Sequence, residues 1–346
     1  MQKKLIALAI AGLASTAAFA QTNVTVYGIV DASASGTTYL GAAGKQTLFK
    51  VNSGLLSTSR IGFKGVEDLG NGLKALFTLE YGLAIDDNQG IGTVSGGTNG
   101  RQQFVGLTGG FGTALAGRLQ TTGLDFSVAA TALGGSTGLG AAYNAGGGTL
   151  VTSATRANNA VAYVSPSFGG VTVAYNHARM TELAGTNGNT DNTANLLSVS
   201  YANGPITAGA IYTKLVNSQT NVAAGDNVKE WGLRVGYDFK VVKLQALYQQ
   251  QKDEAAAVAG GKDKKWAVSA AVPVGAKVAV IAEYASLNVG STANADNVKV
   301  GTLASTYALS KRTTAYAGIV AKRVQSDIGT QGLDTNTYAV GLRHAF

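Results

Sequence analysis

The sequence has no cysteine among its 346 residues, only 3 prolines and 2 histidines, and few charged side chains. The lack of cysteine excludes a disulfide scaffold and a thiolate metal site. His177 and His344 lie far apart in the chain, so we expect neither a zinc site nor a histidine-based catalytic set, and no cofactor. Charged residues make up 13% of the chain, which is about half of the usual ~25%.

The sequence also lacks a long hydrophobic run after its first residues. Beyond residue 20 no segment offers about 20 consecutive apolar residues, which excludes a membrane-spanning helix there. Residues 1–20 combine Lys3 and Lys4 with an apolar run and the triplet A-F-A that ends at Ala20. This pattern is typical of a cleaved secretory signal peptide. We therefore predict an exported protein whose mature chain covers residues 21–346.

Glycine, tyrosine and aliphatic residues are abundant instead. The chain contains 47 glycines, 14 tyrosines and 45% hydrophobic residues, whereas a disordered glycine-rich chain would be poorer in large apolar side chains. The formal net charge is +8, and Lys3 and Lys4 account for two of these charges. This mild and dispersed excess favours attraction of anions. It does not resemble a nucleic-acid-binding arm, so we expect no nucleic-acid partner.

An alternation of apolar and mixed residues recurs along the chain and predicts β-strands. In residues 230–239, for example, Leu233, Val235 and Tyr237 alternate with Arg234 and other residues. Each segment has about 8–11 residues, the length of a tilted strand that crosses a bilayer. The clearest segments are residues 24–32, 60–66, 72–81, 160–165, 170–176, 196–202, 230–239, 241–251, 265–272, 277–285 and 314–321.

Short and long connections alternate between these segments. The seven short turns lie at residues 68–72, 109–112, 165–170, 203–205, 239–241, 273–276 and 310–313. The eight longer polar stretches lie near residues 34–58, 83–100, 121–156, 178–194, 216–228, 253–263, 287–296 and 325–335. Only full closure removes the open edges of so many strands, so we predict an all-β barrel of sixteen antiparallel strands.

The sequence ends on an aromatic residue within a strand-like segment, TYAVGLRHAF. Arg343 and small residues would occupy one face of this strand. The larger side chains that would share the other face include Tyr338, Val340, Leu342 and Phe346. Taken alone, the segment is equally compatible with an edge strand of a soluble sandwich. In a barrel it would pair with the first strand, which begins near Val24, and Phe346 would join an aromatic girdle at the membrane interface.

The chain contains, in this order, six segments that point to a known family: VTVYGIVDA, SRIGFKGVEDLGNGLKALFTLE, RQQFVGLTGGFGTALAGR, SPSFGGVTVAYN, YALSKRT and GLRHAF. They resemble the general trimeric porins of Gram-negative outer membranes, most closely the neisserial and burkholderial branch, over essentially the whole mature chain. The resemblance implies a homotrimer of sixteen-stranded barrels with short periplasmic turns and long extracellular loops. Each barrel would hold a water-filled pore for passive diffusion of small hydrophilic solutes and ions, narrowed by an inward-folded third loop.

The resemblance also implies partners. The barrel would contact outer-membrane lipids and lipopolysaccharide, and the outer-membrane assembly machinery would insert it. The residues that would close the barrel and help this machinery to read the last strand are Tyr338, Val340, Leu342 and Phe346.

A basic cluster is expected on the pore wall. Arg60 faces the lumen by parity, because Ile61 and Phe63 face lipid, and Arg156 falls on the inner side of its strand. Arg101 opens a strand of conflicting parity and is placed inside because it matches a lumen arginine of the family. The weaker members are Lys64, Lys74 and Arg118, and Arg118 could face either the pore or the subunit contact.

Residues 121–156 are predicted to form the constriction loop, and they depart from the family's common pattern. They contain one acid, Asp125, where many porins place several carboxylates. Fixed guanidinium groups in a narrow channel attract anions and repel cations, so we predict an anion-selective pore. Two alternatives stay open. The arginines could merely solvate the lumen or pair with Asp31 and Glu80, and Asp125 could only anchor the loop.

Two other classes of protein remain open at this point. A surface adhesin or structural barrel would be plugged. A barrel enzyme would need a Ser or Asp constellation with a well-placed histidine, which neither histidine offers, so we do not expect an enzyme. Asp86, Asp87 and Asn88 could hold a cation, although a solvated loop or a subunit contact is the more common role of such residues.

Overall fold

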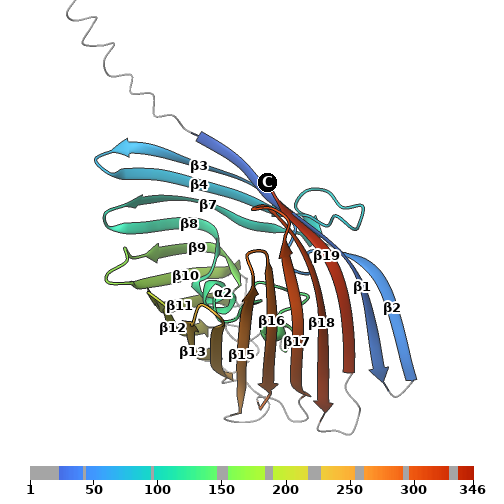
Figure 1. Cartoon of the computed structure of the whole chain (residues 1–346). Coiled ribbons are helices and arrows are strands. Elements are labelled where there is room, and N and C mark those ends of the chain that lie inside the picture. Colours follow the sequence, from blue (N-terminus) through green and yellow to red (C-terminus); the bar gives the residue numbers. More distant parts are fainter. Residues whose placement is uncertain are drawn as a thin grey trace, which may run out of the picture.

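The computed structural model describes residues 23–41, 44–94, 97–145, 155–183, 190–216, 227–253, 261–290, 296–326 and 334–346. One antiparallel sheet curves round until its first and last strands meet (Figure 1). Its strands are β1 (Asn23–Gly41), β2 (Gly44–Ser53), β3 (Arg60–Gly70), β4 (Leu73–Gly82), β7 (Gly100–Gly109), β8 (Gly112–Gln120), β9 (Arg156–Val164), β10 (Val171–Leu183), β11 (Thr190–Asn203), β12 (Ile206–Val216), β13 (Asn227–Asp238), β14 (Lys243–Asp253), β15 (Lys262–Val274), β16 (Val278–Asn288), β17 (Asp296–Ala308), β18 (Thr313–Ser326) and β19 (Asp334–Ala345). The connections hold the pair β5 (Thr93–Val94) and β6 (Gly97–Thr98) and the helices α2 (Thr122–Val128) and α3 (Ala141–Asn144).

The barrel closes between β1 and β19. The two strands run antiparallel, with Ile29 opposite Ala345 at one end and Leu40 opposite Asp334 at the other. Beyond this register, the main chains of Gly28 and Phe346 exchange two N–H···O=C hydrogen bonds of 3.1 Å. The predicted pairing of the first strand with the last is confirmed.

Two strand segments, β2 and β3, are parts of a single barrel strand. Both pair with β1, β2 along residues 32–41 and β3 along residues 23–29. Counted together, they reduce the 17 segments of the sheet to a barrel of sixteen strands. The predicted fold class is therefore confirmed.

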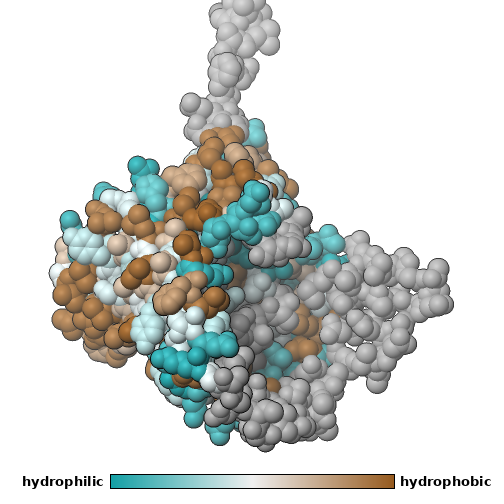
Figure 2. Space-filling model, turned by 90° about the vertical axis from the view of Figure 1, so that its right-hand side faces the viewer, coloured by the Kyte–Doolittle hydropathy of each residue, from teal (hydrophilic) through white to brown (hydrophobic). Residues whose placement is uncertain are grey.

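The outer face of the barrel is apolar, as the alternation predicts. Leu233 and Val235 on β13 are 53% and 56% exposed, whereas Glu230 on the opposite parity is 2% exposed. Aromatic pairs add to this face: the ring centroids of Trp231 and Tyr248 lie 5.3 Å apart. Brown, hydrophobic residues cover a large part of the outer wall in Figure 2. An exposed apolar band of this kind suits contact with lipid.

The seven predicted short turns join strands in the structure. The turn between β3 and β4 shows why they are tight: Asn71 and Gly72 both have positive φ, 52° and 77°. A two-residue hairpin turn of this conformation matches the twist of the flanking strands and favours the pair Asn-Gly.

Two of the predicted long loops are wrong in extent. Residues 34–58 largely form the hairpin of β1 and β2, and residues 178–194 mostly belong to β10 and β11. In β2, for example, the polar residues Lys45, Gln46 and Thr47 follow one another, and the adjacent Leu48 and Phe49 are both exposed. The alternation that marks a membrane strand is lost there, although the hydrogen-bonded ladder continues. The other long loops fall partly on residues outside the described ranges.

A short segment, residues 54–59, interrupts the strand between β2 and β3; we call it the inset. The buried carboxylate of Asp31 on β1 holds the inset in place. One of its oxygens accepts the N–H groups of Leu56 and Ser57 at 3.0 and 2.6 Å, and the other accepts the hydroxyl of Tyr316 at 2.6 Å. The side chain of Leu56 packs against the core cluster inside the barrel. The inset therefore narrows the lumen from the wall side.

A core lies inside the barrel, between the wall and the connection from β8 to β9. Phe126, Leu133 and Leu139 of this connection are buried against wall residues such as Leu247 and Val300. Figure 1 shows α2 within the ring of strands. Among the described residues, no helix reaches the length and apolar character needed to span a membrane.

Candidate functional site

The described part of the connection from β8 to β9, residues 121–145 and 155, crosses the inside of the barrel; we call it the inner loop. The hydroxyl of Thr121 caps α2 by accepting the N–H of Leu124 at 3.3 Å. Single side chains of separate wall strands then bind the loop backbone. Their bonds join Asn176 to Thr122 N at 2.7 Å, Gln245 to Ala129 O at 3.1 Å, Ser269 to Ala132 N at 3.1 Å and Thr302 to Leu139 O at 2.8 Å. The inner loop therefore lies against the part of the wall that is formed by β10 to β17.

Glu283 on β16 makes the strongest of these attachments. One carboxylate oxygen accepts the N–H of Leu133 at 2.7 Å and the other accepts the N–H of Ala141 at 2.9 Å. The carboxylate is buried, and hydrogen bonds to a charged acceptor are worth more than neutral ones. Glu283 alternates with the exposed Tyr284 in the predicted strand segment 277–285, so parity is consistent with its inner position, but the sequence did not indicate what it binds.

The turn of the inner loop docks onto the inset. Leu55 O accepts Ser136 Oγ at 2.6 Å and Gly138 N at 3.0 Å, and Gly54 O accepts Thr137 Oγ1 at 3.1 Å. A Cβ on Gly138 would lie 2.4 Å from Leu55 Cδ2, so only glycine permits this approach. Wall and loop together thus fix the width of the lumen here.

Four arginines line the recess that remains between the wall and the inner loop. The recess has a volume of about 540 Å³. The loop contributes small, apolar and hydroxyl-bearing residues to it, such as Leu124, Val128 and Thr137. The arginines are Arg60, Arg101, Arg156 and Arg343. None of the lining residues in the described part of the chain is acidic.

Glu80 on β4 lies behind two of these arginines. Its carboxylate is 2.6 Å from Arg101 Nε and 3.4 Å from Arg60 Nε, and it also accepts the hydroxyl of Tyr27 at 3.1 Å. Glu80 is 5% exposed. The pairing of lumen arginines with Glu80, which the sequence left open, is therefore present for Arg60 and Arg101.

A β-bulge turns Arg101 into the lumen. The register between β4 and β7 shifts at this point, so that Glu80 faces Gln102 while Tyr81 faces Gly100. Arg101 is the extra residue, and its side chain reaches Glu80 on the inner face. Such a bulge changes the phase of the alternation. The bulge therefore allows Arg101 to face inward although Val105 faces outward, while the adjacent Phe104 packs against a buried cluster on the inner face.

Arg156 and Arg343 line the recess without a salt bridge in the described part of the chain. Arg156 opens β9, opposite Gln120. Arg343 lies on β19, opposite Asp31, and its Nε donates to Ser57 Oγ of the inset at 3.0 Å. Sequence reasoning assigned Arg343 no role, although the parity of the last strand already placed it opposite the apolar face.

The other predicted site residues lie outside the recess. The ammonium of Lys64 sits 5.1 Å from the ring centroid of Tyr27, and Lys74 is exposed near the start of β4. Arg118 pairs with Gln103 on the outward parity and donates to Gly100 O at 2.5 Å. Asp125 accepts Gln120 Nε2 at 2.5 Å, which ties α2 to the end of β8.

The residues predicted to close the barrel lie on its outer face. Tyr338, Val340 and Leu342 are exposed there along β19. The ring of Phe346 covers Gly28, because a Cβ on that glycine would lie 2.4 Å from Phe346 Cζ.

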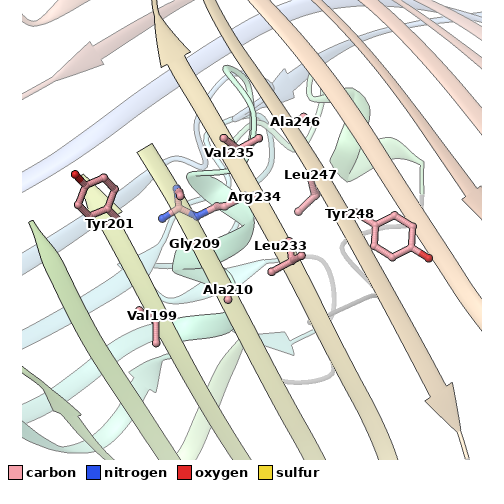
Figure 3. A pocket seen from close by; sticks show the side chains of 11 residues that line it. Val199, Tyr201, Gly209, Ala210, Leu233, Arg234, Val235, Ala246, Leu247 and Tyr248 are labelled. Atoms are coloured by element: carbon pink, nitrogen blue, oxygen red, sulfur yellow. The ribbon is translucent and has the colours of Figure 1, made fainter. Parts of the chain in front are cut away.

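An apolar groove of about 590 Å³ lies on the outside of the wall, across β11 to β14. Figure 3 shows Leu233 and Val235 of β13 and Tyr248 of the adjacent β14 along this groove. Arg234, which alternates with Leu233 and Val235, points to the inner face instead: its guanidinium lies 5.8 Å from the ring centroid of Phe126 in α2 and donates to Ser200 Oγ at 3.2 Å. The groove therefore lies on the apolar outer face of the barrel and is separate from the recess lined by arginines.

The recess can therefore act on ions that pass between the wall and the inner loop. Guanidinium groups keep their charge at all ordinary pH values. Confined between low-dielectric walls, they attract anions and repel cations without forming a covalent bond. Among the described residues, no group of three metal-binding side chains is present.

Comparison with known proteins connects this architecture to a family. A family model described as Gram-negative porin matches residues 7–327. Outer membrane porin protein 32 of Delftia acidovorans is 34% identical over 371 residues, covering 100% of both chains. The major outer membrane protein P.IB of Neisseria lactamica is 31% identical, again over 100% of both chains.

Solved structures agree with these relatives. The anion-selective porin from Comamonas acidovorans has a TM-score of 0.77 at 28% identity, covering 94% of this chain and 100% of its own. OmpT of Vibrio cholerae, solved in a trimer form, has a TM-score of 0.67 at 15% identity, over 94% and 99% of the two chains, and shows likeness of fold alone.

Proposed function

We propose the following role for this chain, which belongs to the Gram-negative porin family: it is an outer-membrane channel through which small hydrophilic solutes and ions diffuse passively, with a preference for anions. The similar porin from Comamonas acidovorans is described as anion-selective. Family membership supports the channel and its location in the outer membrane.

One observation carries the anion preference: four arginines and no acid line the recess in the described part of the chain. Two unit charges about 4 Å apart interact by about 1 kcal/mol in bulk water and about 4 kcal/mol at an effective dielectric of 20. An anion beside this wall is stabilised enough to outcompete cations, yet not so strongly that it cannot leave.

We further propose that the chain assembles as a homotrimer and that residues 1–20 are removed on export. The exposed apolar outer wall supports an environment of lipid and neighbouring subunits. OmpT of Vibrio cholerae, which has the same fold, is known in a trimer form. The relatives are described as porins, and we assign this chain no enzymatic activity.

Two measurements on the purified protein test the channel and its preference. In liposomes, uptake of a small neutral sugar should rise with the amount of protein inserted, whereas a plugged adhesin or structural barrel would leave it unchanged. In planar bilayers under a KCl gradient, the reversal potential should have the sign of a chloride-preferring channel. A potassium preference would contradict the role given to the arginines.

A further inference from the structure

The four arginines of the recess are not equivalent. Glu80 lies within salt-bridge distance of Arg101 and Arg60, at 2.6 and 3.4 Å, so this trio contributes two positive charges and one negative charge. Arg156 and Arg343 have no carboxylate within salt-bridge distance in the described part of the chain. Their charges are therefore compensated least.

Asp31 forms no salt bridge with Arg343, although the two residues face each other across β1 and β19. The carboxylate of Asp31 is fully buried and is occupied by the hydroxyl of Tyr316 and by the N–H groups of Leu56 and Ser57. It belongs to the inset, not to the surface of the recess.

The inset also orients Arg343. The Nε of Arg343 donates to Ser57 Oγ at 3.0 Å, which fixes the plane of the guanidinium. Its two Nη groups make no hydrogen bond with other described residues, and Arg343 lines the same recess as Arg156. A positioned guanidinium with free donors can bind an anion with two N–H groups.

We propose that Arg343 is a further specificity-determining residue of the pore. Arg343 and Arg156 supply the positively charged groups that a permeating anion contacts in the recess. This inference rests on the proposed anion channel and deepens it. The four arginines come from β19, β3, β7 and β9, which lie along one arc of the wall. Arg343 and Arg156 stand at the two ends of this arc, and the trio around Glu80 lies between them.

The absence of cysteine from the chain allows a direct test. An Arg343→Cys variant carries the only thiol and can be modified in the bilayer with a cationic or an anionic methanethiosulfonate reagent. Loss of the guanidinium should lower the chloride-to-potassium permeability ratio roughly two- to fivefold, as expected from removing one nearby charge. The cationic reagent should restore the ratio, and the anionic reagent should lower it further.

The matched control is Arg312→Cys, which changes an exposed arginine in the turn between β17 and β18 at the same end of the barrel. Neither the substitution nor the reagents should alter its permeability ratio by a comparable factor. The inference is overturned if mass spectrometry shows that the Arg343→Cys channel is labelled and its chloride-to-potassium permeability ratio still equals that of the wild type with both reagents. The anion preference of the wild type would then still stand, so the two proposals fail separately.

A second variant avoids the last strand, in case Arg343→Cys does not insert. Ser57→Asp would place a carboxylate beside Arg343 Nε and retains the backbone N–H that Asp31 accepts. We expect a lower chloride-to-potassium ratio than in the uncharged counterpart Ser57→Asn. Equal ratios in these two variants would also overturn the inference.

Discussion

The carboxylate of Glu283 on β16 accepts the backbone N–H of Leu133 at 2.7 Å and thereby joins the inner loop to the wall opposite the arginines. Its second oxygen accepts Ala141 N at 2.9 Å. Each hydrogen bond to a charged group contributes about 1.5–3 kcal/mol. We therefore predict that Glu283→Ala weakens the docking of the loop by several kcal/mol and gives channels with higher and noisier single-channel conductance.

Two comparisons make the prediction specific to the loop. Glu283→Gln keeps one acceptor oxygen and should give a smaller effect than Glu283→Ala. Glu67→Ala removes an exposed acid near the turn between β3 and β4 and should leave the conductance noise unchanged. Identical recordings from Glu283→Ala and the wild type would mean that this carboxylate does not hold the loop.

Phe346 closes the barrel through its main chain and its ring. It exchanges two hydrogen bonds of 3.1 Å with Gly28, and its ring covers that glycine. We predict that deletion of Phe346 lowers the amount of barrel inserted into the outer membrane, measured as heat-modifiable protein in isolated membranes. Gly28→Val should act in the same direction, because a Cβ leaves no room for the ring. Phe346→Tyr, which keeps the ring, should insert normally, and unchanged insertion of the deletion variant would refute the role of this residue.

The exposed apolar wall leads to a prediction about assembly. Residues such as Val105, Leu233 and Val340 are more than half exposed in the single chain, and such surfaces need lipid or another subunit. We predict that the detergent-extracted protein migrates as a compact trimer in unheated gels and as a monomer after boiling. A monomer in both unheated gels and cross-linking experiments would contradict the proposed homotrimer.

The sequence predicted the barrel well because lipid on one side and water on the other impose alternation on each strand. The same parity placed Arg60 and Arg156 inside, and the structure brings both to the recess. Where the alternation breaks, as in β2 at the adjacent residues Leu48 and Phe49, this signal disappears and the strands were read as loop.

Local irregularities account for the rest. The bulge at Arg101 changes the phase of the strand, so parity could not place this residue and only the family resemblance did. The inset depends on a distant carboxylate, Asp31, which no local pattern in residues 54–59 reveals. Arg343 was placed on the inner face by parity, but its position in the same recess as Arg156 depends on closure of the whole barrel.

Replacement of Arg60 and Arg156 by serine should reduce the anion preference while the barrel still folds. Both side chains line the recess, and Arg156 Nε makes no hydrogen bond in the described structure. The serine at position 60 removes one of the two arginines that contact Glu80. Arg101 remains 2.6 Å from Glu80 and keeps that carboxylate paired. We predict a reversal potential that moves toward zero in a KCl gradient. The preference of the wild type should itself shrink in concentrated salt, because the Debye length falls from about 10 Å at 0.1 M to about 3 Å at 1 M. A double variant with the wild-type reversal potential at 0.1 M salt would remove these two arginines from the selectivity of the pore.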